Sequence, residues 1–307
     1  AAILIFAVVP LNGVFAQEDA LSLCYVVHSD PSGSFWDVAT QGAQDAADSM
    51  GVTLTAVGSP DPATQAQLIE DCIAQGVDGL AVSLANPDAL QDAVTNAVNA
   101  GIPVITLNSG VDVYKELGAL THVGQTERVA GNGAGERLSA MGATKVLCVI
   151  HEEGNIGLEQ RCDGLTETFT GEVERFNVAS TGVLDLAGTT ATLQDKLIAD
   201  SSLDAIIALN PDIGIAARDA VIANGSSQIL ATFDLSPAVL QSILDGEISF
   251  AIDQQQYLQG YLPIVFLTLY NQNANVVGGG LPVLTGPGFV DASNAAAVID
   301  LSAAGTR

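Results

Sequence analysis

Short, uninterrupted apolar segments alternate with longer segments of helical periodicity along almost the whole chain. Apolar segments that do not alternate with polar residues predict strands buried on both faces. Their regular alternation with helices predicts a parallel sheet that is covered by helices on both sides. In the first half of the chain we expect strands at 21–27, 52–57, 78–84 and 103–107, and helices at 35–50, 62–75 and 87–99.

The same pattern starts again after the middle of the chain. We expect strands at 145–150, 173–178, 204–209 and 229–233, and helices at 156–169, 189–200 and 213–224. A long helix at 257–272, a glycine turn at 278–280 and a final strand around 282–290 follow. The predicted fold is α/β, with two tandem doubly wound parallel-sheet lobes.

No stretch rich in Pro or Ser separates the two halves, and short crossings between them are expected near 123–125 and 252–255. Several short crossings predict that the lobes are joined by a multi-strand hinge rather than by a loose tether. We expect an N-terminal lobe at 21–124 plus 255–280 and a C-terminal lobe at 125–254 plus 281–307.

The two halves also resemble each other in sequence. Asn86-Pro-Asp in the first half corresponds to Asn210-Pro-Asp in the second. The next strand ends at Asn108 in the first half and just before Asp234 in the second. Asx-Pro suits the start of a helix, so capping alone would account for part of the repeat. These residues also follow the carboxyl ends of predicted strands, where open α/β sheets bind ligands, so two facing sheets would bring them into one cleft.

The charge of the chain excludes some partners. Among 307 residues, 35 are acidic and 9 are basic, which gives a formal net charge of −26. This charge repels the phosphates of nucleic acids and disfavours anionic membrane surfaces, so neither is an expected partner. The acidity itself is expected to serve solubility, or tolerance of salt or low pH.

The beginning of the chain has the pattern of an export signal. Residues 1–16 are apolar, are interrupted by Pro10 and Gly13, and end in Val14-Phe15-Ala16 before a polar segment. A hydrophobic core that ends at a small residue predicts the remnant of a cleaved signal peptide. The segment is short for a membrane span. We therefore expect a periplasmic or other extracytoplasmic location.

Export permits disulfide bonds, and the chain has four cysteines. Cys148 lies on a predicted strand and Cys162 on the helix that follows it. Because a strand and the next helix pack together, a Cys148–Cys162 bond is expected. Cys24 and Cys72 are interpreted instead as buried free thiols, a common state for cysteine.

Several short motifs resemble one known family when they are taken in order. They are the segments 28–36 with Gly42-Ala43, 76–80, 100–108, 161–164, 209–210, 232–234 and 250–254. Together they are similar to the type I periplasmic sugar-binding proteins, the ribose- and glucose/galactose-binding group. The resemblance implies the periplasmic binding protein-like I fold, in which two lobes close on a sugar and present it to the membrane permease of an ABC importer.

The resemblance also implies which residues contact the ligand. They are Phe35, Trp36, Asn108, Ser109, Arg161, Asn210, Asp234 and Gln254. The family often has an aspartate, in some members followed by an arginine, where this chain has Asn108-Ser109. The contacts to one end of the ligand are therefore expected to differ. No calcium loop of the glucose/galactose type is recognisable.

These residue types suit a sugar, which has apolar C–H faces and a belt of hydroxyls. Trp36, the only tryptophan, can stack on a sugar face, or alternatively can attach the first helix to the core. The Arg161 fork can hold two hydroxyl oxygens, and Asp234 can accept from hydroxyl protons. The alternatives are a surface ion pair of Arg161 with Glu159 or Asp163, and a plain helix cap for Asp234.

The sequence therefore predicts a monomeric solute-binding protein that captures a pentose or hexose, with no cofactor and no enzymatic activity. One alternative keeps the fold and changes the ligand to a polyol, a furanone signal or another small polar molecule, with a chemoreceptor as a further partner.

An enzyme is a less favoured alternative, because the chain has no P-loop and no Gly-x-Ser-x-Gly elbow. Its three histidines, at 28, 122 and 151, lack the spacing of a zinc site. The glycine-rich segment 131–135 lies inside a helical pattern, which predicts close helix packing rather than a dinucleotide loop.

Overall fold

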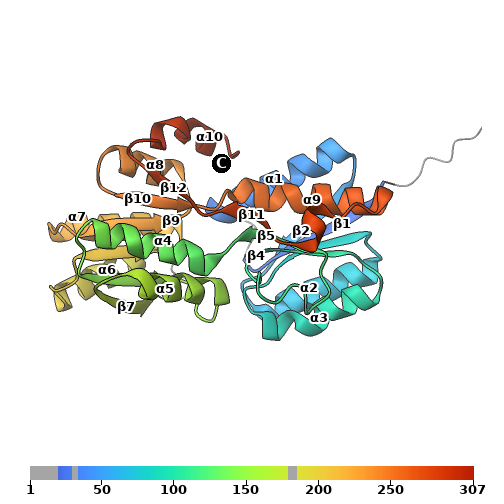
Figure 1. Ribbon diagram of the computed structural model, residues 1–307, viewed down its shortest axis with the longest axis horizontal. Helices are drawn as coiled ribbons and strands as arrows, with labels where there is room; N and C mark the ends of the chain where they lie inside the picture. Colours follow the sequence, from blue (N-terminus) through green and yellow to red (C-terminus); the bar gives the residue numbers. More distant parts are fainter. Residues whose placement is uncertain (1–19, 30–33, 179–184) are drawn as a thin grey trace, which may run out of the picture.

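The computed structural model describes residues 20–29, 34–178 and 185–307. Within these ranges the chain forms two α/β lobes that lie side by side along the longest axis of the molecule (Figure 1). The fold class predicted from the sequence is confirmed. The predicted signal-peptide remnant at 1–16 lies outside the described residues. Among the helices in these ranges, none is both long and apolar enough to cross a membrane.

The first lobe is built on a six-stranded parallel sheet with the order β11-β5-β4-β3-β1-β2. Its strands are β1 (Ser22–Val27), β2 (Thr53–Gly58), β3 (Gly79–Ser83), β4 (Val104–Asn108), β5 (Thr121–Gln125) and β11 (Val283–Gly286). One face carries the helices α1 (Ser34–Met50) and α9 (Gln256–Asn273), and the other carries α2 (Pro62–Gln75) and α3 (Pro87–Asn99).

The second lobe repeats this plan with the order β12-β10-β9-β8-β6-β7, in which only the β10–β12 pair is antiparallel among the pairs of these residues. Its strands are β6 (Lys145–Ile150), β7 (Glu172–Asn177), β8 (Ala205–Ala208), β9 (Ile229–Phe233), β10 (Phe250–Asp253) and β12 (Gly288–Asp291). One face carries α4 (Glu127–Ala140) and α5 (Ile156–Thr168), and the other carries α6 (Leu186–Ala199), α7 (Pro211–Asn224) and α8 (Pro237–Leu244). Two 3₁₀ turns, η1 (Val277–Gly280) and η2 (Ala295–Ala297), and the short helix α10 (Ile299–Ala303) complete the fold.

Local sequence explains where many of these elements begin and end. The central strands β3, β4 and β8 are buried along their whole length, as their continuous apolar sequences predict. The first helical residue of α2, α3, α7 and α8 is a proline, whose missing N–H would have no partner inside the helix at that place. Gly76 and Gly225 end α2 and α7 in the left-handed conformation, which costs glycine little.

In the part of the chain that the structure describes, three segments cross between the lobes, from β5 to α4, from β10 to α9 and from β11 to β12. The first two crossings fall where the sequence predicts them. The third corrects the predicted boundary, because β11 joins the sheet of the first lobe although residues 281–307 were all expected in the C-terminal lobe. The single strand expected around 282–290 is divided at Pro287, which has no N–H to donate to a sheet.

Both possible strand–helix disulfides are formed. Cys148 on β6 is bonded to Cys162 on α5, as predicted. Cys24 on β1 is bonded to Cys72 on α2, so their interpretation as free thiols is wrong. The second pair was missed because 48 residues separate the two cysteines, and only the packing of α2 against β1 brings them together.

The glycines of α4 allow its close contact with α5. A Cβ atom on Gly131 would lie 2.1 Å from the carbonyl oxygen of Arg161, and one on Gly135 would lie 2.8 Å from that of Leu165. A side chain at either place would therefore collide with the backbone of α5. The prediction of close helix packing for segment 131–135 is confirmed.

Candidate functional site

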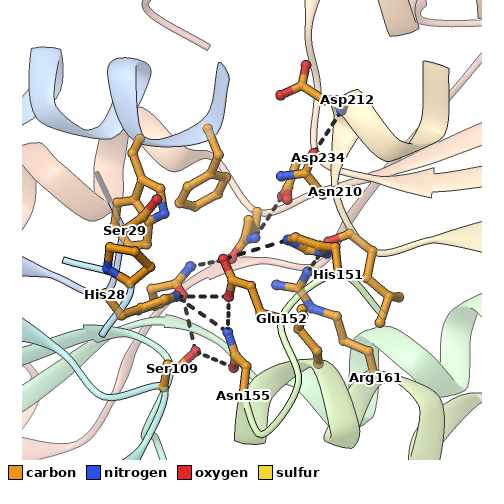
Figure 2. Close-up of a pocket in the computed structure, with 18 of the residues that line it drawn as sticks. His28, Ser29, Ser109, His151, Glu152, Asn155, Arg161, Asn210, Asp212 and Asp234 are labelled. Atoms are coloured by element: carbon orange, nitrogen blue, oxygen red, sulfur yellow. Dashed lines mark hydrogen bonds and ion pairs between the residues drawn. The ribbon is translucent and has the colours of Figure 1, made fainter. Parts of the chain in front are cut away.

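A cavity of about 540 Å³ lies between the two lobes, at the carboxyl ends of their strands. Its volume is in the usual range for sites that bind small molecules. Figure 2 shows its two sides, with His28 and Ser109 of the first lobe facing Arg161, Asn210 and Asp234 of the second. All eight residues predicted to bind ligand line this cavity: Phe35, Trp36, Asn108, Ser109, Arg161, Asn210, Asp234 and Gln254.

Asn108 and Asp234 hold equivalent places in the two lobes, directly at the ends of β4 and β9. Both have a positive φ, 60° and 69°. Asn and Asp are the ordinary residues that tolerate this left-handed conformation best. Backbone conformations of this kind concentrate at ligand sites, where the surrounding structure holds them. The repeat found in the sequence therefore corresponds to a repeated backbone feature of the cavity wall.

Arg161 is buried and is held by three hydrogen bonds within the second lobe. Its Nε donates to Glu127 Oε2 at 2.6 Å, and its Nη2 donates to Glu127 Oε1 at 3.1 Å. Its Nη1 donates to the carbonyl oxygen of Leu209 at 3.0 Å, and its guanidinium lies 4.4 Å from the ring centre of Phe233. This arrangement fixes the plane of the guanidinium, which bidentate hydrogen bonding to a ligand requires.

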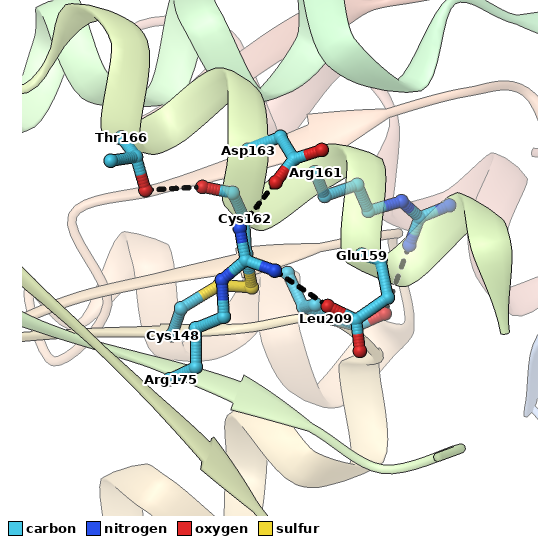
Figure 3. The surroundings of a disulfide bond; sticks show 8 residues. All are labelled: Cys148, Glu159, Arg161, Cys162, Asp163, Thr166, Arg175 and Leu209. Atoms are coloured by element: carbon cyan, nitrogen blue, oxygen red, sulfur yellow. Dashed lines mark hydrogen bonds and ion pairs between the residues drawn. A yellow bond between two sulfur atoms is a disulfide. The ribbon is translucent and has the colours of Figure 1, made fainter. Parts of the chain in front are cut away.

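The surface ion pair considered for Arg161 is not formed. Figure 3 shows that Glu159 and Asp163, the two candidate partners, instead bind Arg175. The disulfide between Cys148 and Cys162 lies beside Arg161 and attaches α5 to the sheet. The helix that carries Arg161 is thus anchored by a covalent bond, and the guanidinium itself by a buried ion pair.

Asp234, Gln254 and Asn108 form a hydrogen-bonded chain across the base of the cleft. Gln254 Nε2 donates to Asp234 Oδ1 at 2.7 Å, and Asn108 Nδ2 donates to Gln254 Oε1 at 3.4 Å. Burial raises the pKa of Asp234 to about 7, and Arg161 and the bond from Gln254 oppose this rise. Gln254 lies at the second crossing, so this chain connects a hinge segment to the polar residues of both lobes.

Trp36 and Phe35 begin α1 and form an apolar wall of the cavity. The two rings meet edge to face with centres 4.9 Å apart, and the ring of His28 meets Trp36 in the same way at 4.9 Å. Both aromatic residues also belong to the core under α1. The stacking role and the core role proposed for Trp36 are therefore compatible in this geometry.

Asn210 both lines the cavity and caps a helix. Its Oδ1 accepts from the backbone N–H of Asp212 at 2.8 Å, which leaves its amide nitrogen for other partners. Asn86, its counterpart in the first lobe, also lines the cavity, but its side chain makes no capping hydrogen bond to α3. Capping therefore explains Asn210 but not Asn86. The position beside the cavity explains both asparagines.

Sequence reasoning missed a cluster of titratable residues in the cavity. Glu152 lies between two histidines, with its Oε2 3.6 Å from His28 Nε2 and its Oε1 3.8 Å from His151 Nε2. Asn155 Nδ2 donates to Glu152 Oε2 at 2.6 Å. Burial lowers the pKa of both histidines and so favours their neutral forms. Burial alone would raise the pKa of Glu152, but the histidines, Asn155 and Arg161 together lower it.

The lobes are in contact around the rim of the cavity. Ser34 Oγ, at the start of α1, donates to Asp212 Oδ2 at the start of α7, at 2.7 Å. The backbone N–H of Ile156 donates to the carbonyl oxygen of Ala85 at 3.0 Å. His28 and Glu152 also come from opposite lobes. This conformation is closed, and each of these contacts would be lost if the lobes separated.

The site combines flat aromatic surfaces with planar groups that donate and accept hydrogen bonds. Carboxylate, amide and guanidinium groups from both lobes line this one cavity. Hydroxyl groups both donate and accept, so a polyhydroxylated ring can satisfy this mixture. Among the described residues, no group of three or more His, Cys, Asp or Glu side chains has an arrangement that could hold a metal ion.

Comparisons with known proteins agree with this geometry. The xylose/arabinose-binding protein XylF of Sulfolobus acidocaldarius is 29% identical, with 92% of this chain and 74% of that protein covered. The ribose import binding protein RbsB of Escherichia coli is 26% identical, with 82% and 86% covered. A solved structure of a carbohydrate transporter from Acidothermus cellulolyticus 11B, in complex with myo-inositol, is 41% identical. It has a TM-score of 0.91 and covers 94% of this chain and 100% of that one.

A family model for the periplasmic binding protein domain matches residues 24–273, which is most of the chain. Proteins of this family act outside the cytoplasm. The resemblance inferred from the sequence motifs is thereby confirmed, and the chain belongs to the type I periplasmic sugar-binding protein family.

Proposed function

We propose that this protein captures a monosaccharide, a pentose or a hexose, by closing its two lobes around it. The observation that carries the proposal is the cavity between the lobes, which all eight predicted residues line from both sides. The names of the similar proteins support the ligand class, since they bind xylose, arabinose and ribose.

The proposed binding mode follows from the chemistry of the wall. Trp36 and Phe35 cover an apolar face of the sugar ring, while Arg161 and Asp234 bind its hydroxyls from the second lobe. Hydrogen bonds to charged groups contribute roughly 1.5–3 kcal/mol each. Because both lobes supply contacts, the ligand binds the closed form more tightly and shifts the population toward it.

The closed, loaded form is proposed to deliver the sugar to the permease of an ABC importer. Members of the family are binding proteins of transporters, which supports a role in transport rather than in catalysis. We further propose that the protein is a monomer and that a chemoreceptor is a second partner that binds the closed form. Its export is proposed to use a signal peptide that is then removed.

A cyclic polyol is a second candidate ligand, and one observation favours it. The 41% identical protein from Acidothermus cellulolyticus 11B was crystallised with myo-inositol. Inositol presents a belt of hydroxyls around an apolar ring, as a pyranose does, so the same cavity wall would suit both.

Isothermal titration calorimetry of the purified protein tests the proposal. The panel contains D-xylose, L-arabinose, D-ribose, D-glucose, D-galactose and myo-inositol. We expect saturable binding of a pentose or hexose, with no chemical change in the ligand recovered afterwards. Binding of myo-inositol alone would select the second candidate, and binding of none of the six would reject both.

A further inference from the structure

The ion pair between Glu127 and Arg161 is unusual because it is buried beside a site for small polar ligands. The two side chains are only 2% and 5% exposed. Glu127 takes two of the five N–H groups of the guanidinium, and the carbonyl of Leu209 takes a third. Among the contacts of the described residues, the remaining two N–H groups, one on each terminal nitrogen, are left for a ligand. Glu127 therefore determines which N–H groups of the guanidinium face the cavity.

Glu127 is also connected to the hinge. It is the first residue of α4, directly after the crossing from β5, and Gln125 at the end of β5 donates to its Oε2 at 2.9 Å. Gln125 belongs to the sheet of the first lobe, where it is paired with β11. A rotation of the backbone at this crossing would move the carboxylate and, with it, the guanidinium.

The pair changes the charge that a ligand meets. Arg161 is the only Lys or Arg among the described residues that line the cavity, whereas Glu152, Glu153, Asp212 and Asp234 all line it. The segments 30–33 and 179–184 contain no Lys or Arg either. Since Glu127 already neutralises Arg161, the cavity offers directional donors without any excess of positive charge.

We propose that Glu127 is a positioning residue that orients the Arg161 fork toward the ligand and, by neutralising it, makes the cleft select uncharged ligands over anionic ones. This inference rests on the proposed function, because it deepens the ligand class of the same site. Glu127 itself lies behind the guanidinium and is not among the residues that line the cavity.

Two substitutions of Glu127 separate its two effects. Glu127→Gln keeps the shape but removes the charge, and its amide can accept from only one of the two guanidinium N–H groups. The charge of Arg161 then becomes available to an anionic ligand. Glu127→Asp keeps the charge but shortens the side chain by one methylene. The guanidinium of Arg161 is then still neutralised but is no longer held in the same position.

The experiment measures dissociation constants by calorimetry for neutral sugars and for acidic sugars of nearly the same size. The neutral probes are the six named above, and the anionic probes are D-glucuronate and D-galacturonate. We expect the wild type to bind a neutral probe and to discriminate against both uronates. In Glu127→Gln, the preference for the neutral probe should fall about tenfold or more, the change expected for one charge-assisted interaction. In Glu127→Asp, the affinity for the neutral probe should fall, while the preference for the neutral probe over the uronates should remain.

Glu159→Gln is the matched control, because Glu159 lies on α5 and binds Arg175 at 2.6 Å on the surface. It should change neither affinity nor preference. Thermal melts establish that each variant is folded. The inference is overturned if the wild type binds uronates as tightly as neutral sugars, a measurement that needs no variant, or if folded Glu127→Gln keeps the wild-type preference. Both results leave the proposed function intact, whereas failure of every neutral probe removes the function and this inference together.

Discussion

Asp234 shows how burial gives one side chain of the cavity an unusual chemistry. Its carboxyl is enclosed at the end of β9, and its pKa of about 7 means that it is partly protonated at neutral pH. Glu127 and Asp253 contribute to the raised pKa, and Arg161 opposes it. A sugar hydroxyl that donates to the carboxylate favours the ionised form. Binding should therefore couple to the loss of a proton from Asp234.

We predict that ligand binding to the closed form near pH 7 releases a proton, and that affinity for this form rises as pH increases toward about 7. The sign follows because the ligand lowers a pKa that burial has raised. Calorimetry in two buffers of different ionisation enthalpy measures the proton release. Asp234→Asn should remove the release and weaken binding by about tenfold to a hundredfold, the loss of one hydrogen bond to a charged group. Unchanged proton release in this variant would show that another group is responsible.

The sequence identified eight residues of the cavity wall, but neither the cluster around Glu152 in that wall nor the residues behind it. Trp36, Arg161 and Asp234 are recognisable because their types suit sugar binding and their motifs resemble a family. Glu127 was missed because a glutamate at the start of a polar helix has the pattern of a solvated residue. Only the tertiary contact with Arg161 explains its burial, and such a contact lies beyond the reach of local sequence.

At the scale of helices, small residues determine how closely α4 and α5 approach. Gly131 meets the carbonyl of Arg161, whereas a Cβ atom added to Gly133 of the same helix would lie 2.5 Å from the far end of the Phe289 ring. A ring can move aside, but a helix backbone cannot move without its whole helix. The two glycines therefore offer a matched comparison.

We predict that Gly131→Ala lowers the free energy of unfolding by about 1–3 kcal/mol and also weakens ligand binding. The added methyl would push α5 away from α4 and displace Arg161. Gly133→Ala should cost less and leave the affinity unchanged. Thermal unfolding and calorimetry measure both effects, and equal losses of affinity in the two variants would contradict the role given to helix separation.

The two disulfides differ in the length of chain that they close. Cys24–Cys72 spans 48 residues and Cys148–Cys162 spans 14. Chain-entropy arguments assign about 4 kcal/mol to the longer loop and about 3 kcal/mol to the shorter. We predict that replacing Cys24 and Cys72 by alanine lowers the melting temperature more than replacing Cys148 and Cys162. Both pairs remove two buried sulfur atoms, so each serves as the control for the other, and the reverse order would refute the loop-length argument.

Most elements were predictable from the sequence because apolar periodicity and caps are local signals. The helices at 62–75 and 87–99 and the strand at 145–150 have the predicted bounds. The end of the chain was less predictable, since a strand around 282–290 cannot reveal that its two halves join different sheets. Which sheet each half joins depends on the relative positions of the two lobes, which are set by tertiary structure.

For the molecule as a whole, closure decides the environment of the cleft. The internal repeat predicted two facing sheets, and the carboxyl ends of their strands do enclose the cavity. His28 belongs to the first lobe, where its Nδ1 lies 2.7 Å from Ser83 Oγ. Glu152 and Asn155 of the second lobe complete its surroundings in the closed form. When the lobes separate, water replaces these partners.

We predict that acid opposes closure through His28. Burial in the closed form lowers its pKa, and Arg161 adds to this effect, while Glu152 opposes it. In the open form the ring is hydrated and its pKa returns toward the ordinary value of about 6.5. Because the open form holds the proton more tightly, protonation favours opening as pH falls through this range. Small-angle X-ray scattering at saturating ligand should show the compact form at pH 7.5 and a larger radius of gyration at pH 5.

His28→Asn separates this effect from that of Asp234, because asparagine keeps a polar side chain but does not titrate. The variant should stay compact to a lower pH than the wild type. His151 also has a pKa lowered by burial, but it lies on the same lobe as Glu152. Closure should therefore change its surroundings less, and His151→Asn should shift the opening pH less than His28→Asn does. If both variants open at the wild-type pH, the acid response belongs to Asp234 alone, and the contact between His28 and Glu152 has no part in closing the lobes.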